Sequence, residues 1–354
     1  MVYESDLALR LVPYVAGEQP KNVKLIKLNT NENPYPPSPK VAEAIAAVPS
    51  DALRLYPDMD AAALCAAIAQ VNGVAPECVF CGNGSDEVLA FAFAAFFAGK
   101  TLCAPDVTYS FYPVYANLFG VDYRTVPLKA DFTVDVEGLM QGGPIALANP
   151  NAPTGILLES AQVRRLAAHT RENGAVLLVD EAYAAFSPQN ALPLLGEFDN
   201  VLITRTFSKS HQLAGMRVGY AIGSPRLIAA LKRIRDSFNS YPLDRLAQAA
   251  AEAAMLDTAY TEETVRLVCE ARDDCYDALT AAGIPVLKSA TNFLFVQADP
   301  VDAASVQQAL RQEGVLVRHF GAERLRAWLR VTVGTKADMQ IVTQKLLKYC
   351  KPVV

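Results

Sequence analysis

The residues best suited to carry chemistry surround Lys209, in the stretch 204–220. This stretch begins just after the apolar run 201–203, which predicts a short buried strand, and it combines Lys209 and Arg217 with several hydroxyl side chains. In open α/β sheets, ligands bind beyond the carboxyl ends of the strands. Small residues between the two cations, Gly215 among them, let the backbone pass close to a ligand. An amine, a guanidinium and hydroxyls around one loop suit an aldehyde and a phosphate.

A Ser-Lys dipeptide alone is weak evidence, because among 32 Lys and Arg residues it usually marks a solvated surface lysine. Three further stretches fit the same chemistry. Residues 180–183, Asp-Glu-Ala-Tyr, end a second apolar run with a carboxylate and a phenol, and residues 149–155, Asn-Pro-Asn-Ala-Pro-Thr-Gly, follow a third. Residues 82–87, Gly-Asn-Gly-Ser-Asp-Glu, open an apolar helix whose first turn offers unpaired N–H groups to a phosphate.

Together, and in this order, these stretches resemble the fold-type I pyridoxal-phosphate aminotransferases, and within them the histidinol-phosphate aminotransferases. The resemblance covers nearly the whole chain. It implies that pyridoxal 5'-phosphate is the cofactor, that Lys209 forms a Schiff base with it, and that Asp180 pairs with its pyridine nitrogen. It also places Tyr183 on the ring 3-oxygen. The other implied cofactor contacts are Gly84, Ser85, Asp86, Tyr109, Asn151, Thr206, Ser208, Arg217 and, from a neighbouring subunit, Tyr56.

The chain departs from the family at one position of the site. The residue before Pro153 is usually an asparagine that hydrogen-bonds the ring 3-oxygen, and here it is Ala152. Asn151 is adjacent, but side chains of neighbouring residues in an extended segment point in opposite directions. Either Tyr183 makes that hydrogen bond alone, or Asn151 reaches the ring from an altered backbone.

Four residues are candidates for binding the substrate. Arg330 lies within an apolar predicted strand, where its charge is costly unless paired. The resemblance pairs it with the substrate α-carboxylate, in a planar two-toothed contact that lysine could not make. It also directs Arg318 and Tyr14 at the substrate phosphate, and it places Asn31 in an N-terminal arm that covers the active site.

The order of predicted elements indicates an α/β fold. Strands and helices alternate through the first two thirds of the chain, which predicts a mostly parallel sheet with helices on both faces. The last third predicts long helices and then a smaller α+β C-terminal domain. Among the predicted elements are a helix that opens at Thr108, strands over 145–148 and 293–296, and helices over 245–257 and 336–349. At 354 residues the chain exceeds the usual size of a single core. We expect an arm over residues 1–40 packing with the small domain, a large cofactor-binding domain over 41–245, and interdomain helices with the small domain over 246–354.

Composition excludes several other classes of protein. A formal net charge of −5 argues against nucleic-acid binding, which requires a basic face. Seven cysteines scattered through apolar segments indicate buried thiols in a reducing compartment, and three histidines far apart give a metal site little support. The N-terminus lacks the order of a signal peptide, and the longest apolar stretch, 88–98, is shorter than the roughly 20 residues that span a bilayer. A cytoplasmic enzyme that binds no membrane is expected.

The expected reaction is transamination between L-histidinol phosphate and 2-oxoglutarate, in histidine biosynthesis and in a homodimer. An aminotransferase for aromatic amino acids is the nearest alternative, because one sequence does not separate an imidazole pocket from a phenyl pocket. A lyase resembling phosphothreonine decarboxylase shares the fold and the motifs, but it would consume its substrate without an oxoacid. A cofactor-binding regulator would need a DNA-binding domain, for which the resemblance leaves no residues.

Overall fold

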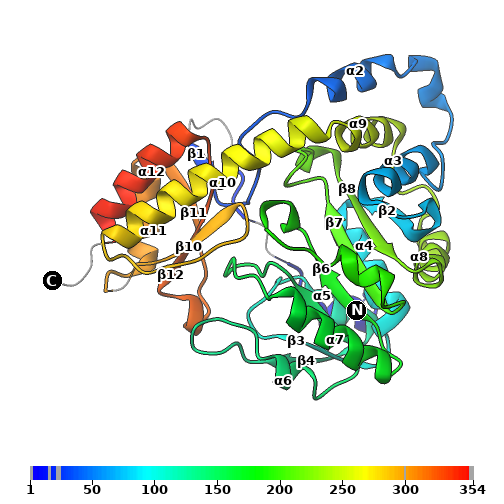
Figure 1. Cartoon of the computed structure of the whole chain (residues 1–354), viewed down its shortest axis with the longest axis horizontal. Helices are drawn as coiled ribbons and strands as arrows, with labels where there is room; N and C mark the ends of the chain where they lie inside the picture. Colours follow the sequence, from blue (N-terminus) through cyan, green and yellow to red (C-terminus); the bar gives the residue numbers. More distant parts are fainter. Residues whose placement is uncertain (1–2, 15–16, 21–24, 299, 351–354) are drawn as a thin grey trace.

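The computed structural model describes residues 3–14, 17–20, 25–298 and 300–350, and these residues build two β-sheets (Figure 1). The larger sheet has seven strands in the order β2-β8-β7-β6-β5-β3-β4, and the smaller has five in the order β1-β11-β12-β10-β9. The larger sheet contains β2 (Val79–Asn83), β3 (Thr101–Pro105), β4 (Asp122–Val126), β5 (Ile145–Ala148), β6 (Leu177–Asp180), β7 (Val201–Thr206) and β8 (Val218–Gly223).

Five neighbouring strands of the larger sheet, β7-β6-β5-β3-β4, run parallel, and only β8 pairs antiparallel with its two neighbours. The central strands are apolar throughout because both of their faces are covered. One face packs against α4 (Gly84–Ala92), α5 (Tyr112–Phe119) and α8 (Pro225–Phe238). The other packs against α3 (Ala62–Asn72), α7 (Ser160–Glu172) and α9 (Arg245–Leu256). The predicted α/β architecture is therefore confirmed.

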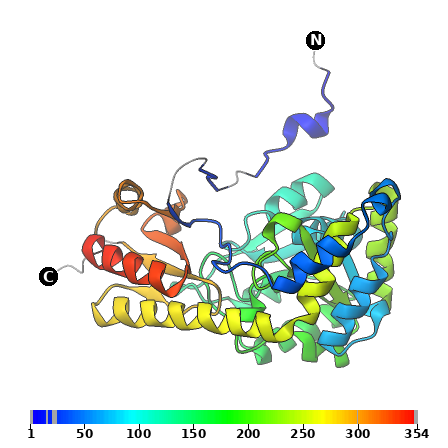
Figure 2. The same ribbon diagram turned by 90° about the horizontal axis from the view of Figure 1, so that it is seen from above.

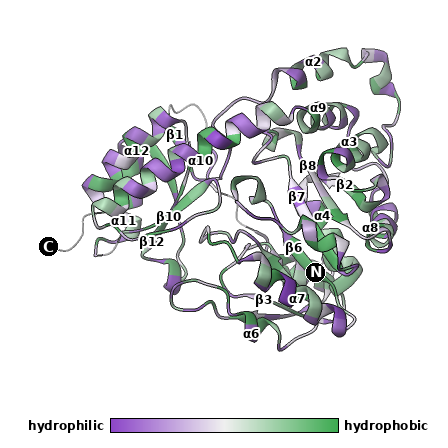
Figure 3. Ribbon diagram, viewed as in Figure 1, coloured by the Kyte–Doolittle hydropathy of each residue, from purple (hydrophilic) through white to green (hydrophobic). Residues whose placement is uncertain are grey.

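The smaller sheet gathers strands from both ends of the chain. It contains β1 (Ile26–Leu28), β9 (Val286–Leu287), β10 (Phe293–Gln297), β11 (Val315–His319) and β12 (Trp328–Thr332). Its core includes side chains of α10 (Thr258–Ala281), α11 (Ala303–Gln312) and α12 (Lys336–Tyr349). Helix α10 is the long yellow helix that runs from beside the larger sheet to the smaller one in Figure 2. In Figure 3 strand β10 is green, whereas helices α10 and α12 alternate between purple and green residues.

The N-terminal segment is less uniform than the extended arm that the sequence predicted. It contains a short helix, α1 (Asp6–Arg10), and the strand β1, which pairs parallel with β11. Helix α2 (Pro39–Ala47) then begins with Pro39 in its first turn, where a missing N–H costs nothing. Another boundary also differs, because the helix expected to open at Thr108 begins only at Tyr112.

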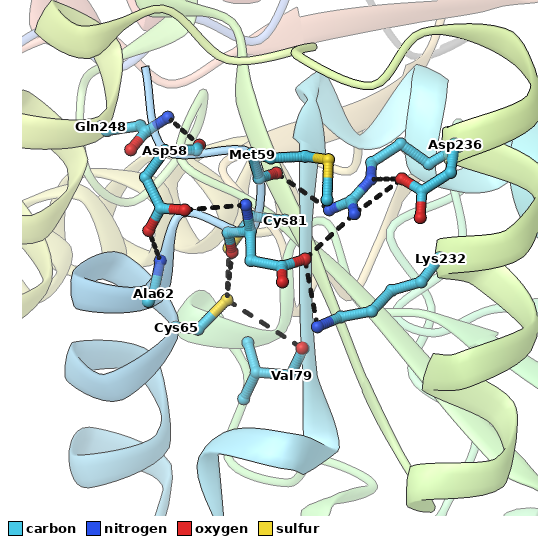
Figure 4. Close-up of polar contacts among 11 residues, drawn as sticks. Asp58, Met59, Ala62, Cys65, Val79, Cys81, Lys232, Asp236 and Gln248 are labelled. Atoms are coloured by element: carbon cyan, nitrogen blue, oxygen red, sulfur yellow. Dashed lines mark hydrogen bonds and ion pairs between the residues drawn. The ribbon is translucent and has the colours of Figure 1, made fainter. Parts of the chain in front are cut away.

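A polar cluster lies between α3, α8 and the strand β2 (Figure 4). Asp60 accepts hydrogen bonds from Lys232 at 3.1 Å and from the buried Arg235 at 3.0 Å. Sγ of Cys65 lies 3.6 Å from Sγ of Cys81 in β2, and both thiols are free and buried. Cysteine was expected to serve as a small buried side chain, and here it packs α3 onto β2. In the described part of the chain, no helix is both long and apolar enough to span a membrane.

Candidate active site

Lys209 lies just beyond the carboxyl end of β7. The strand continues to Thr206 because Thr206 pairs with Gly219 of β8, so the polar end of the stretch remains part of the sheet. Nζ of Lys209 donates a 3.1 Å hydrogen bond to the carbonyl oxygen of Thr30. Burial, and after it the charge of Arg330, lowers the pKa of Lys209 to about 8. Its amine is therefore neutral at mildly alkaline pH, as a nucleophile or a base must be.

Asp180 ends the neighbouring strand β6, and only 5% of it is exposed. Its Oδ2 accepts a hydrogen bond from the Tyr112 hydroxyl at 3.1 Å, while Oδ1 faces the Ala182 amide at 3.3 Å and the Thr204 hydroxyl at 3.4 Å. Burial raises the pKa of this carboxyl to about 6. Among the described residues, no cation forms an ion pair with it. A buried, ionised carboxylate without a cationic partner costs free energy, and a protonated ring nitrogen would supply that partner.

Two glycines and Arg217 form a cradle at the start of α4. Gly84 has a φ of +77°, and a Cβ there would come within 2.5 Å of Nη2 of Arg217. A Cβ on Gly219 would collide with the backbone of Ser85, so both glycines are required for this close approach. Arg217 has a φ of 53°, a strained conformation for an arginine, and it pairs with Asp86 at 3.0 Å. The guanidinium thus stands beside the open N–H groups of a helix N-terminus, an arrangement that suits a phosphate.

The other residues expected around the cofactor divide into two groups. Thr206 and Ser208 are buried beside Lys209, and the Ser208 amide donates to Oγ1 of Thr206 at 3.1 Å. The Tyr109 hydroxyl donates to Oδ1 of Asp86 at 2.7 Å, which places its ring beside the cradle. Tyr56 is different, because it is 79% exposed and stacks on Tyr241 at 4.7 Å. Within the described residues, Tyr56 forms no hydrogen bond, ion pair or ring contact with the other site residues.

Asn31 and Tyr183 meet across the site. Nδ2 of Asn31 donates a 2.9 Å hydrogen bond to the Tyr183 hydroxyl. Oδ1 of Asn31 accepts from the Thr332 hydroxyl at 3.0 Å, and its carbonyl oxygen accepts from Asn292 at 3.1 Å. Asn31 has a φ of 56°, a conformation that asparagine tolerates better than most residues. Here the side chain of Asn31 contacts Tyr183 and Thr332 of β12, and its expected contact with the substrate stays a prediction.

The geometry at Ala152 favours one of the two alternatives left open by the sequence. Nδ2 of Asn151 donates to the carbonyl oxygen of Val107 at 2.9 Å and to Oγ1 of Thr154 at 3.0 Å. Both hydrogens of this amide are therefore committed to acceptors of the protein, and its buried Oδ1 has no partner. Ala152 has no polar side chain, so Tyr183 remains as the donor for a ring oxygen.

Two neighbouring guanidinium groups belong to the smaller sheet, and the charge of Arg330 is close enough to Lys209 to lower its pKa. Arg330 of β12 and Arg318 of β11 are register partners, and no described carboxylate pairs with either of them. Arg330 donates to the carbonyl oxygen of Asn29 at 3.1 Å, but its buried Nε has no partner. Its guanidinium lies 5.4 Å from the ring centre of Phe293, and burial lowers its pKa. Two unpaired cations side by side favour an anionic ligand.

Tyr14 completes this side of the site, where it stacks on Phe111 at 4.5 Å. It lies close enough to Arg330 to raise the pKa of Arg330 against the larger effect of burial.

Tyr112 was not predicted as a site residue, although it follows Tyr109 by three residues. It ends the stretch Thr-Tyr-Ser-Phe-Tyr at 108–112, which predicts the start of a helix and does not indicate a contact with Asp180. In the described residues, no group of three His, Cys, Asp or Glu side chains could hold a metal ion.

Known proteins share this architecture. A family model described as aminotransferase class I and II matches residues 23–346. Histidinol-phosphate aminotransferase of Acetobacter pasteurianus is 50% identical over 346 residues, covering 97% of this chain and 96% of that protein, and the protein of that name from Pseudomonas putida (strain W619) is 50% identical over 338 residues, covering 95% and 97%. A crystal structure of histidinol-phosphate aminotransferase from Sinorhizobium meliloti in complex with pyridoxal-5'-phosphate has a TM-score of 0.87 at 26% identity, covering 99% of this chain and 98% of that chain. The chain belongs to the class I and II aminotransferases.

Proposed function

We propose that this aminotransferase uses pyridoxal 5'-phosphate to transfer the amino group of L-histidinol phosphate to 2-oxoglutarate, a step of histidine biosynthesis. Relatives of that name are about 50% identical over nearly the whole chain. The observation that carries the proposal is the pair Arg318 and Arg330, two neighbouring guanidinium groups without a described carboxylate partner. A phosphorylated amine and a dicarboxylic acid are anions that such a pair can bind in turn.

The residues present fit the cofactor. When bound, pyridoxal phosphate supplies an aldehyde that receives the amino group and a protonated ring that delocalises the electrons of a carbanion. Lys209 is placed to hold the aldehyde, Asp180 the ring nitrogen and Tyr183 the ring 3-oxygen. Tyr109 stacks on the ring, and Asp86 orients Arg217. The proposed phosphate contacts are Gly84, Ser85, Thr206, Ser208 and Arg217, with Tyr56 from a second subunit.

Lys209 is also the proposed base. Lys209 would hold the aldehyde of the cofactor, and once the substrate amine takes its place there, its neutral Nζ would be the base that accepts the proton of the substrate α-carbon. The amine must be neutral to do so, and a pKa of about 8 leaves an appreciable neutral fraction at physiological pH. Burial is the largest cause of the lowered pKa, so excluding water from the site also makes Lys209 a better base at physiological pH.

The two half-reactions place different demands on the arginines. Glutamate carries an α-carboxylate, which the planar guanidinium of Arg330 can bind with two hydrogen bonds. Histidinol phosphate has no carboxylate, so its phosphate is assigned to Arg318 and Tyr14, with Arg330 beside them. The unpaired Nε of Arg330 supports this assignment, because a buried donor without a partner favours a ligand that accepts from it.

The proposal includes a cytoplasmic homodimer with three structural parts. Leu53, Leu55 and Tyr56 are each more than half exposed, which is unfavourable for a monomer and suits a subunit interface. The parts are an arm over residues 1–40, a cofactor-binding domain over 41–245, and interdomain helices with a small domain over 246–354. The two separate sheets, and the pairing of β1 with β11, support this division.

The test is a steady-state assay of glutamate formation from 2-oxoglutarate, with L-histidinol phosphate and with phenylalanine as amino donors. We expect kcat/KM to be about a hundredfold higher for histidinol phosphate, because charge-assisted hydrogen bonds to a phosphate contribute about 1.5–3 kcal/mol each. A preference for phenylalanine would move the function to aromatic amino acids. Loss of O-phosphothreonine with release of carbon dioxide, without any oxoacid, would identify a lyase.

A further inference from the structure

Tyr112 contacts Asp180 and was not among the site residues that the sequence singled out. It is the first residue of α5, its side chain is fully buried, and its hydroxyl donates to Oδ2 of Asp180 at 3.1 Å. The rings of Phe93 and Tyr109 pack around it, with centroids 5.8 Å and 5.7 Å away. A buried tyrosine ring held on two sides places its hydroxyl at a defined point.

We infer that Tyr112 is a positioning residue that holds the Asp180 carboxylate in one orientation and in its ionised form, ready for a protonated ring nitrogen. The inference rests on the proposed role of Asp180 toward the cofactor. It adds a residue that makes no expected contact with cofactor or substrate and acts only through Asp180.

The pattern of donors around Asp180 supports this assignment. Oδ2 has one described donor, the Tyr112 hydroxyl, whereas Oδ1 shares the longer contacts from Ala182 and Thr204. A carboxylate can accept about four hydrogen bonds, so donors to both oxygens limit its rotation and still leave room for a ligand. Removing Tyr112 would leave Oδ2 buried without any described partner, so the carboxylate could rotate.

The charges near Asp180 make its ionised form hard to maintain. Besides Tyr112, the titratable groups that interact with it include Asp86, Tyr109, Tyr115 and Tyr183. The tyrosines are neutral at physiological pH and Asp86 repels a second negative charge, so none of these four groups is a cation that stabilises the carboxylate. Burial is the main cause that raises the pKa of Asp180, and the Tyr112 hydrogen bond is the largest effect that lowers it.

Tyr112 itself remains a donor under all ordinary conditions. Burial, and after it the charge of Asp180, raises its pKa well above the usual value for a tyrosine. The phenol therefore keeps its proton while the carboxylate loses its own. A protonated phenol beside a carboxylate stabilises the ionised form by hydrogen bonding, in the manner that lowers carboxyl pKa values elsewhere.

The test compares two phenylalanine substitutions on one helix. Tyr112→Phe removes only the hydroxyl and keeps the ring. Tyr115→Phe is the matched control, because Tyr115 lies one turn further along α5, is 4% exposed, and has a buried hydroxyl without a partner. The first readout is the carboxyl titration of Asp180 in the apo-protein, followed by NMR with aspartate labelled at the carboxyl carbon. Asp180→Asn identifies the resonance.

We expect Tyr112→Phe to raise the proton affinity of Asp180 about tenfold, since a hydrogen bond to a charged group contributes on the order of 1.5 kcal/mol. Tyr115→Phe leaves the titration unchanged. Thr204→Val, which removes a 3.4 Å donor from the other oxygen, gives a smaller change in the same direction. The second readout is the dissociation constant of pyridoxal phosphate, which Tyr112→Phe should raise about twofold at pH 7, because a tenfold higher proton affinity lowers the ionised fraction of Asp180 from about nine tenths to about one half.

The two readouts separate failure of the inference from failure of the proposed function. An Asp180 titration that is the same in Tyr112→Phe and in the native protein, or that moves equally in Tyr115→Phe, would overturn the inference. An Asp180→Asn variant that binds the cofactor as tightly as the native protein would instead remove Asp180 from the cofactor site. Circular dichroism and thermal unfolding confirm that each variant is folded before either comparison is made.

Discussion

Nδ2 of Asn31 lies 2.9 Å from the hydroxyl of Tyr183, and this hydrogen bond joins the N-terminal segment to the residues that follow β6. Because Asn31 donates, the Tyr183 hydroxyl keeps its own proton for another acceptor. Asn31 is in turn anchored to Thr332 of β12. The phenol is therefore oriented by contacts with both sheets of the molecule.

Tyr183→Phe should change the electronic state of the bound cofactor, because Ala152 provides no second donor for the ring oxygen. We expect the pH at which the visible absorbance of the bound cofactor changes to rise by about one unit, since a donor to an anionic oxygen contributes about 1.5 kcal/mol. A pH titration by absorbance measures this midpoint. Fluorescence titration with pyridoxal phosphate should also show weaker binding.

Asn151→Ala provides the comparison for that experiment. It removes hydrogen bonds to Val107 and Thr154, and we expect it to lower the free energy of unfolding by about 1–3 kcal/mol without moving the absorbance midpoint. A midpoint that moves in Asn151→Ala and stays constant in Tyr183→Phe would show that the asparagine, and not the tyrosine, contacts the ring oxygen.

Lys209→Ala should abolish transamination and preserve the fold. The loss of both the nucleophile and the base is expected to reduce kcat by at least about 10³-fold. Burying the charged amine of Lys209 costs free energy, so its removal does not destabilise the core. The midpoint temperature of thermal unfolding should therefore stay near that of the native protein. Lys336→Ala, at an exposed position of α12, is the control and should be fully active. Retained turnover in Lys209→Ala would remove this lysine from the mechanism.

The pKa of Lys209 gives a pH-dependent prediction. The folded-state value of about 8 lies below the ordinary 10.5, so between these two values the folded protein has released a proton that the unfolded chain still binds. The contribution of Lys209 to the free energy of unfolding therefore rises with pH across that window. The rate at which the apo-protein couples with the aldehyde of pyridoxal phosphate should rise with a midpoint near pH 8, which stopped-flow absorbance can follow.

Arg330→Met tests the cause of that pKa. After burial, the charge of Arg330 is the largest effect that lowers the pKa of Lys209, so its removal should move the coupling midpoint to higher pH. Arg266→Met, on the exposed side of α10, should leave the midpoint in place. A midpoint near 10.5 in the native protein would contradict the buried environment of the lysine.

Glu181 stabilises the strand that carries Asp180 from the opposite face of the sheet. Its side chain is fully buried and accepts hydrogen bonds from Nε and Nη2 of Arg205 at 2.9 Å and 2.7 Å. Glu181→Ala leaves that guanidinium without its carboxylate, and we expect the free energy of unfolding in urea to fall by about 3–5 kcal/mol. Glu270→Ala removes an exposed pair with Arg266 and should cause no measurable change. Equal stability of the two variants would show that the buried pair is not needed.

Subunit mixing tests whether Tyr56 completes the site of a second chain. Tyr56→Ala and Lys209→Ala proteins are each expected to be nearly inactive. In a hybrid dimer, one site has both native residues if Tyr56 acts across the interface, so co-expression should restore activity that neither parent has. If Tyr56 acted within its own chain, both sites of the hybrid would remain defective and the mixture would show no gain.

Much of the fold could be predicted because the central strands are buried on both faces and therefore read as apolar runs. Strand β5 occupies residues 145–148 and helix α12 residues 336–349, as the sequence indicated. Helix α9 and strand β10 differ from their predicted ends by a single residue. The start of α5 was harder to predict, because Thr108 and Tyr109 belong to the loop beside the cradle and not to the helix.

The candidate site was predictable to the extent that its residues follow strands of one sheet. Neighbouring parallel strands end at the same edge of a sheet, so Asp180 at the end of β6 and Lys209 after β7 were expected at one edge. Contacts between distant segments were not predictable in this way. The Asn31 hydrogen bond to Tyr183 and the Tyr112 hydrogen bond to Asp180 span 152 and 68 residues, and no local pattern encodes such a pairing.

The most direct measurement is the visible absorbance of the purified protein, saturated with pyridoxal phosphate, during titration with L-histidinol phosphate and separately with phenylalanine, without oxoacid. We expect the cofactor band to convert to its aminated form with histidinol phosphate at a concentration about a hundredfold below that required for phenylalanine. Conversion by phenylalanine alone would contradict the proposed substrate. Absence of any cofactor band after addition of pyridoxal phosphate would contradict the site itself.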